Sequence, residues 1–133
     1  MSYDVSLSAL PKGVKSLLDY KGKEIPLGPI ELVRTKVEQL FDSISWTDES
    51  DKFFHANAAL GGSTIEVSLS KKDPCNYVGF SLRGKSGFLG KLLELSKSTG
   101  WSIIDDQEMS VLDESNINSG MQDWENFRDS IDE

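Results

Sequence analysis

Three successive segments between residues 54 and 83 alternate apolar and polar side chains, and this alternation constrains the fold more than any other feature. A period of two places every second side chain on the same face of a strand, so each segment is typical of a strand with one buried face. Only Gly61 and Gly62 separate the first two segments, and this pair tolerates the positive φ angles of a tight hairpin turn. A longer turn at residues 71–76 precedes the third segment. We therefore expect an antiparallel meander with one face directed inward.

Two amphipathic helices are predicted on either side of this meander. Apolar residues recur three and four positions apart over residues 30–44, directly after Pro29, which fits the first position of a helix. A second apolar stripe runs over residues 88–95, with Ser86 as its N-cap and Gly100 just past its end. Each helix therefore has one apolar face that must pack against another element.

Further alternating segments at residues 3–8, 101–104 and 109–112 complete the order β-α-β-β-β-α-β-β. This order predicts an α+β fold, a two-layer sandwich of one mostly antiparallel sheet with both helices on one face. A chain of 133 residues is long enough for one domain, which we place at residues 1–114. Residues 115–133 are expected to form an acidic tail or a docking helix, because apolar residues recur there at helical spacing.

The charge of the chain is concentrated near its C-terminal end. Its 22 acidic and 14 basic residues give a formal net charge of −8, and the last 29 residues contain ten acids and only Arg128 as a base. Nucleic acids and anionic membrane surfaces are bound through clustered lysine and arginine, so we expect neither as a partner. Complementary charge favours a basic protein partner, although a net negative charge also serves solubility alone.

Two sequence features bear on location. No apolar run is long enough to cross a bilayer, and the N-terminus lacks the basic and apolar regions of a signal peptide. We therefore expect a cytoplasmic protein, as a monomer or a homodimer.

The acidic residues expected to face a basic partner form two groups. One group lies in the loop after the first helix, and the other surrounds and follows the turn between the last two strands. Trp124 in the tail is a candidate anchor, because tryptophan is enriched at the energetic centres of interfaces. The same acids would equally suit solvated turns. They are Asp48, Glu49, Asp51, Asp105, Asp106, Glu108, Asp113 and Glu114.

Residues 79–86 match the phosphate-loop pattern G-x-x-x-x-G-K-[ST]. In such a loop Lys85 would contact the β- and γ-phosphates and Ser86 would bind Mg²⁺. The strand alternation of residues 77–83 runs through the segment, whereas a phosphate loop begins where a buried strand ends. A small nucleotide-binding enzyme that uses Gly79–Ser86 is therefore kept as the alternative function.

Other signs of catalysis are weak, and we expect no enzyme activity. His55 is the single histidine and falls on the polar face of its predicted strand. Cys75 is the single cysteine and lies in a turn near Lys72, a base that could lower a thiol pKa. One histidine and one cysteine do not make a zinc site of the usual kind, so neither a metal nor another cofactor is expected.

Four short segments carry a resemblance to a known group of proteins. They are the opening Met-Ser-Tyr-Asp, Ile44-Ser45-Trp46, Ile-Glu-Val-Ser-Leu at residues 65–69, and Gly-Trp-Ser-Ile-Ile-Asp at residues 100–105. Together with the element order, they resemble small, largely uncharacterised bacterial α+β proteins, some of which are similar to immunity proteins of toxin–immunity systems. The resemblance covers about residues 3–112 and contains no specific motif, so it carries over no functional residue. It implies an acidic, non-enzymatic protein that binds a cognate toxin.

Overall fold

The computed structural model describes residues 3–11, 13–48, 50–61, 63–83 and 87–116. Within these residues the chain forms seven strands, two α-helices and one 3-10 helix. In chain order they are β1 (Tyr3–Ser8), η1 (Leu17–Asp19), α1 (Ile30–Glu38), β2 (Ser43–Thr47), β3 (Phe53–Leu60), β4 (Ser63–Ser70), β5 (Val78–Arg83), α2 (Phe88–Thr99), β6 (Ser102–Asp105) and β7 (Ser110–Leu112).

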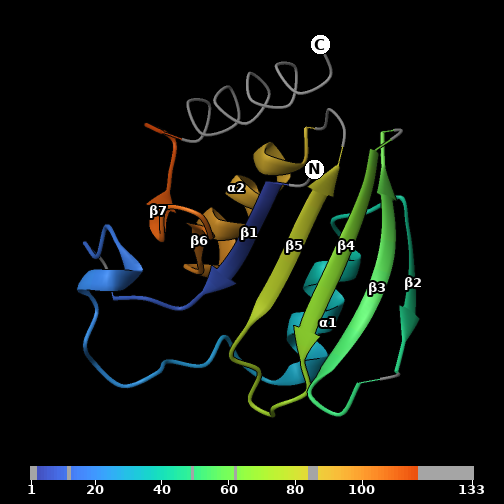
Figure 1. Cartoon of the computed structure of the whole chain (residues 1–133), viewed down its shortest axis with the longest axis horizontal. Coiled ribbons are helices and arrows are strands. Elements are labelled where there is room, and N and C mark those ends of the chain that lie inside the picture. The colour runs from blue at the N-terminus through green and yellow to red at the C-terminus, as the bar shows by residue number, and fades with distance from the viewer. Residues whose placement is uncertain (1–2, 12, 49, 62, 84–86, 117–133) are drawn as a thin grey trace.

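All seven strands belong to one antiparallel sheet with the order β2-β3-β4-β5-β1-β6-β7. The first strand of the chain lies between β5 and β6, so α2 carries the chain across β1. Both helices lie behind the sheet in Figure 1, and the other sheet face is directed at the viewer. The predicted α+β class and the mainly antiparallel sheet are therefore confirmed.

The core fills the space between the helices and the sheet. Val67, Phe80 and Val5 form a cross-strand row through the sheet centre and are at most 2% exposed. The ring of Phe88 in α2 packs edge-on against Phe80, with ring centres 5.0 Å apart. Each such side chain contributes roughly 1.5–3 kcal/mol when fully buried, and this burial holds the two layers together.

The strand β2 was not predicted. The apolar residues of residues 30–44 continue a helical spacing, but α1 ends at Glu38, and Ile44 and Trp46 pair with Ala58 and Ala56 across an antiparallel ladder. The Leu40 amide bonds to the Val37 carbonyl, an i−3 contact that tightens and closes the last turn of the helix. Residues 43–47 therefore form a strand and do not continue the helix, because the edge of β3 provides hydrogen-bond partners for their backbone.

Two predicted chain reversals are confirmed. Leu60 pairs with Ser63, so the chain reverses between these two residues, and Gly61 has φ +56°. Gly100 ends α2 with φ +81°, a left-handed conformation that favours glycine, and its amide bonds to the Ser96 carbonyl. The predicted N-cap of α2, Ser86, lies outside the described residues.

Candidate functional site

The sheet face opposite the helices carries polar side chains in rows that cross the strands. His55, Ser68, Gly79 and Ser6 lie in register on β3, β4, β5 and β1 and form the middle row. A row two residues away contains, in the same strand order, Asn57, Glu66, Ser81 and Asp4. On the other side of the middle row, the rings of Phe53 and Tyr77 meet edge-on, with centres 6.1 Å apart.

The middle row lies below the two neighbouring rows on this sheet face, because its central residues are small. Gly79 leaves room there for Tyr77, since a Cβ at this position would lie 2.4 Å from the Tyr77 hydroxyl oxygen and would displace it. The Tyr77 side chain therefore lies along β5 and ends over Gly79. The neighbouring Ser6 is only 4% exposed. The result is a hollow with an aromatic wall on one side and an acidic wall on the other.

Two carboxylates form the acidic wall near β1. The Ser81 hydroxyl donates to Asp4 at 2.7 Å, and the Ser6 hydroxyl donates to Asp106 at 2.8 Å. Asp106 directly follows β6, and its amide donates to the Asp4 carbonyl at 3.1 Å, which fixes the two acids on adjacent strands. Farther along the row, Glu66 forms an ion pair of 3.5 Å with Arg83.

The hollow has a volume of about 550 Å³. Among the described residues, its lining includes the carboxylates of Asp4, Glu66 and Asp106 but neither lysine nor arginine. A second hollow of about 510 Å³ lies beyond Phe53 and Tyr77, and its lining includes Lys52, Lys71 and Lys72 together with Asp51. The second hollow is therefore the more basic of the two.

Two groups in the hollow have shifted pKa values. The pKa of Asp106 is raised, first by burial and then by the charges of Asp4 and Asp105, while the Ser6 hydroxyl acts in the opposite direction. Burial also raises the pKa of Tyr77, and the charges of Asp106 and Asp4 add to that shift. Both shifts report negative charge gathered in a partly desolvated place, which a bound cation would offset.

The acids predicted from the sequence are not brought together. Asp48 and Asp51 lie by β2 and β3, at one end of the strand order, and Asp48 forms an ion pair with Lys71. The other predicted group follows β6 and β7 at the opposite end. Glu49 and Trp124 lie outside the described residues. A continuous acidic surface over both groups is therefore not formed by the described residues.

Asp105 was predicted as a contact residue but has a structural position. It lies at the end of β6 and is 8% exposed. Its carboxylate accepts from the Tyr3 hydroxyl at 2.9 Å and from the Gln107 amide at 3.0 Å, and so fixes the turn after β6. A strand residue opposite an inward side chain is buried with it, and Asp105 pairs with the inward-facing Val5. Glu108, in the same turn, is exposed.

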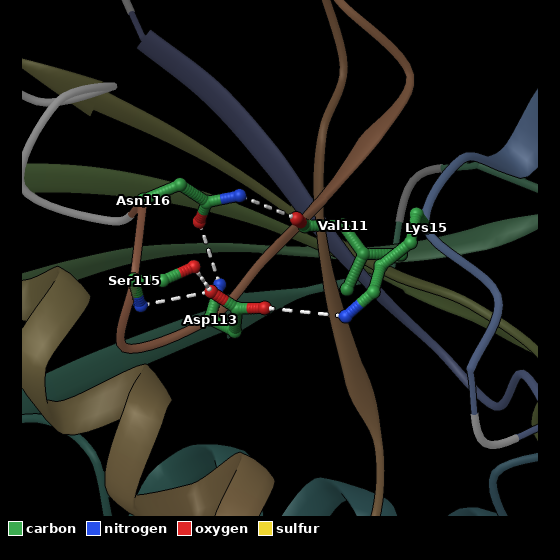
Figure 2. A network of polar contacts seen from close by, with 5 residues as sticks. All are labelled: Lys15, Val111, Asp113, Ser115 and Asn116. Carbon is green, nitrogen blue, oxygen red and sulfur yellow. Dashed lines mark hydrogen bonds and ion pairs between the residues drawn. The ribbon is translucent and has the colours of Figure 1, made fainter.

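The acids after β7 are also engaged in local contacts, as Figure 2 shows. The Asp113 carboxylate accepts from the Ser115 amide at 2.8 Å and lies 3.8 Å from the Lys15 ammonium. Asn116 closes the same turn, because its side chain accepts from the Asp113 amide and donates to the Val111 carbonyl. The hydrogen bonds from Ser115 lower the pKa of Asp113. Glu114 is paired with Lys97. Asp113 and Asn116 thus fix the turn after β7, and Glu114 adds an exposed ion pair.

The phosphate-loop match is placed mainly in a strand. Residues 79–83 belong to β5, which is paired with β1 and β4, and Phe80 and Leu82 point into the core. Their extended backbone does not have the cradle form that binds phosphate. Lys85 and Ser86 lie outside the described residues.

The remaining reactive side chains are separate. Cys75 is fully buried, and burial is the main cause of its raised thiol pKa, so the thiolate that a nucleophile requires is disfavoured. The Nδ1 atom of the exposed His55 lies 3.2 Å from the Ser68 hydroxyl. In the described part of the chain, no carboxylate bonds to the other ring nitrogen, so this contact is not extended to a triad. The same part contains no cluster of three or more histidine, cysteine or acidic side chains suited to a metal ion.

No protein family matches this sequence. A search of curated proteins likewise found no relative. No helix in the described ranges is long and apolar enough to cross a membrane.

Sequence reasoning missed Asp4, Glu66 and Tyr77 as site residues. Each belongs to, or directly precedes, a strand whose alternation was read only for its apolar positions. The polar positions of the same pattern could have indicated part of the site. The two-residue hairpin fixes the register of β3 against β4, and this register determines which polar side chains are neighbours on the open face. The position of β1 beside β5 was not available from that pattern.

Proposed function

We propose that this chain is a non-enzymatic domain that binds a basic protein partner through the open face of its sheet. The observation that carries the proposal is the hollow, which combines an aromatic wall with Asp4, Glu66 and Asp106 and contains no lysine or arginine among its described lining residues. Aromatic side chains next to carboxylates suit the recognition of basic protein surfaces, because they combine contact area with complementary charge.

Binding accounts for the arrangement better than acid–base catalysis does. His55 and Ser6 occupy opposite ends of the middle row, with β4 and β5 between them. Three strand spacings separate them by about 14 Å, and Asp106 lies on the Ser6 side. A histidine and a carboxylate at this separation do not act on one substrate atom. A wide surface with separated polar groups is typical of protein recognition.

An immunity-type inhibitor is the particular form of this proposal. The net charge of −8 and the resemblance of the chain to immunity-like proteins support it. The mechanism is masking: the open face would cover a basic surface of the partner, and the negative charge would accelerate and orient the encounter. A cytoplasmic location and a monomeric or homodimeric state belong to the same proposal.

Charge reversal at the hollow tests this function. The full-length chain, Glu66→Lys and Glu94→Lys would each be used to capture proteins from a lysate of the native host at low and high salt. Glu94 is exposed on α2, behind the sheet, so its reversal makes the same change of charge on the other side of the molecule. We expect a basic protein to be captured by the wild type and by Glu94→Lys, and to be lost with Glu66→Lys.

High salt should weaken capture as well, because dissolved ions screen the attraction between exposed charges, whose range is already only about 8–10 Å at physiological salt. Circular dichroism of each variant would verify folding, since the exposed pair between Glu66 and Arg83 contributes only about 0–1 kcal/mol. Equal capture by both variants, or no capture by any of the three proteins, would contradict the proposed function.

The nucleotide alternative is tested separately by calorimetry with ATP or GTP and Mg²⁺. We expect no binding heat at millimolar nucleotide, because residues 79–83 are committed to the sheet. Binding that disappears in Lys85→Ala would replace the proposal by the alternative.

A further inference from the structure

The two outer edges of the sheet, at β2 and β7, differ in how they are covered (Figure 1). Residues 15–17 lie along the outer side of β7. The Val111 amide bonds to the Lys15 carbonyl at 2.9 Å, and the Leu17 amide bonds to the Met109 carbonyl at 2.8 Å. Among the described residues, β2 pairs with β3 alone. The fold therefore covers the edge at β7 and leaves the edge at β2 open to another strand.

Two hydrogen bonds show which residues of β3 are directed at β2. The Asp42 amide donates to the Ala59 carbonyl at 3.0 Å, and the Thr47 hydroxyl donates to the His55 carbonyl at 3.3 Å. Residues of an antiparallel ladder alternate between those bonded to one neighbour and those directed away from it. Ala59, His55 and the residue midway between them therefore form the set of β3 that bonds to β2.

The backbone groups that β2 presents to its open side follow from this alternation. The first, third and fifth residues of β2 stand opposite the bonding set of β3, so their N–H and C=O groups are used within the sheet. The N–H and C=O groups of Ile44 and Trp46 are therefore directed outward. They form a short row of unpaired donors and acceptors of the kind to which another strand can add.

The strand β2 lacks the features that commonly protect an exposed edge. Its sequence, Ser-Ile-Ser-Trp-Thr, contains neither a charged residue nor a proline. Ile44 and Trp46 are only half-buried against the core, so an added strand would cover more of their apolar surface. The Trp46 indole N–H donates to the Glu38 carboxylate at 3.1 Å, and the Arg34 guanidinium lies 4.8 Å from the ring centre. The open edge is thus bordered by apolar surface that is fixed in place.

The charges at the two ends of β2 select the strand that fits. The exposed Asp42 directly precedes β2 and accepts from the neutral Gly61 amide, and Asp48 directly follows β2. The Asp48 side chain remains 65% exposed beside Lys71. A second copy, paired antiparallel about Ser45, would place Asp42 opposite Asp48 at both ends, and like charges in this position destabilise a sheet. A strand with basic residues at its ends would instead be attracted.

We propose that the edge of β2 accepts an extended segment of a partner protein as an additional antiparallel strand. The segment has two apolar residues, spaced two positions apart, opposite Ile44 and Trp46. It has lysine or arginine at each end, opposite Asp42 and Asp48. Main-chain hydrogen bonds provide the affinity, and the apolar and basic positions provide the specificity. The inference goes beyond the proposed function, because it concerns the edge of the sheet and not its open face.

Hydrogen exchange of the free, full-length chain tests whether the edge is available. Relative to their intrinsic rates, the Ile44 and Trp46 amides should exchange about tenfold or more faster than the Ser45 amide, which is bonded to β3. Slow exchange at all three amides would show that a second copy or another part of the chain already occupies the edge, and it would overturn the inference.

The binding test is an NMR titration of the full-length, ¹⁵N-labelled chain with the peptide acetyl-Lys-Thr-Val-Thr-Val-Thr-Lys-amide. We expect saturable shifts in β2 and slowed exchange of the Ile44 and Trp46 amides. N-methylation of both valines should abolish binding, because their amides face β2 in the antiparallel pairing. N-methylation of the first and last threonines, whose amides face away, should change the affinity by about twofold at most.

Two changes of charge test the ends of the strand. A peptide with glutamate in place of both lysines should bind about fivefold more weakly. Asp42→Asn should weaken binding of the lysine peptide by about twofold, a usual effect of losing one exposed charge pair, and it keeps an oxygen that accepts from Gly61. Glu94→Gln removes one negative charge from the helix α2 and should leave the affinity unchanged.

The inference is overturned by absence of binding at millimolar peptide, by equal binding of the two methylated peptides, or by loss of binding with the methylated threonines alone. Equal affinity for the lysine and glutamate peptides, or shifts outside β2 only, would overturn it as well. The proposed function fails separately, because it is measured by partner capture with Glu66→Lys and not by exchange at β2.

Discussion

Gly79 illustrates how one residue shapes the open face. The absence of a side chain at this position allows Tyr77 to lie along β5 and form one wall of the hollow, since an added Cβ would lie 2.4 Å from the Tyr77 hydroxyl. Its neighbours in the sheet also keep the middle row low, because Ser6 and Ser68 are small. The geometry of the hollow thus depends on a glycine that has an ordinary strand conformation.

Gly79→Ala is expected to displace Tyr77 and to destabilise the fold by about 1–3 kcal/mol, a usual cost of overpacking. Urea unfolding followed by circular dichroism measures this change. Gly90→Ala is the matched control, because an added Cβ at Gly90 meets nothing within 4 Å. In the helix α2 that change should stabilise the protein by about 0.5–1 kcal/mol. Equal effects of the two substitutions would contradict the packing of Tyr77 on Gly79.

The carboxyl of Asp106 gives a second prediction at the residue scale. Asp4 and Asp105 are its acidic neighbours, Tyr77 is also near, and burial is the main cause of its raised pKa. A carboxyl with a raised folded-state pKa binds its proton more tightly in the folded chain. Its contribution to stability therefore falls as pH rises from the ordinary value of 3.8 through the folded-state pKa.

Carbon-detected NMR titration should place the pKa of Asp106 above 3.8, and Asp4→Asn should lower it by removing one negative neighbour. The free energy of unfolding of Asp106→Asn, relative to that of the wild type, should be higher at pH 7 than at pH 3. The substitution removes a carboxylate that destabilises the folded chain only in its ionised form. An Asp106 pKa at or below the ordinary value would contradict the desolvated position of this group.

At the scale of elements, the turn after β7 is fixed by Asp113, Ser115 and Asn116. Asp113→Ala removes the acceptor for the Ser115 amide, and this change should speed hydrogen exchange at the Ser115 and Asn116 amides. The stabilising effect of Asp113 should also be lost as pH falls, since its pKa is lowered in the folded chain. Glu114→Ala is the control, because the exposed pair with Lys97 contributes little. Equal exchange in the two variants would contradict this role of Asp113.

The elements also show how far sequence patterns reach. Alternation predicted the strands of the meander, and the glycines at positions 61 and 100 predicted where the chain turns. The same kind of pattern failed at residues 39–47, because Phe41 and Ile44 continue a helical spacing while the backbone pairs with β3. Local periodicity cannot distinguish a helix from a strand over these residues. The outcome depends on pairing with the edge of β3, which comes from a later part of the chain.

At the scale of the whole molecule, the candidate site is a product of strand order. Asp4 and Asp106 are separated by about a hundred residues, yet β1 pairs with β6 and brings their backbones within hydrogen-bond distance. The acidic loops predicted from the sequence are instead divided between opposite ends of the sheet. Counting acids along the chain therefore found negative charge but could not find where the fold gathers it.

The central claim is that the open face, and not the helical side, contacts the partner. The most direct measurement replaces Asn57 in the hollow, or Glu94 on α2, with the photo-crosslinking residue p-benzoylphenylalanine in the native host. Both positions are exposed, so either replacement should be accommodated. The account predicts a covalent adduct with a basic protein from position 57 and none from position 94. An adduct from position 94 alone, or from neither position, would contradict it.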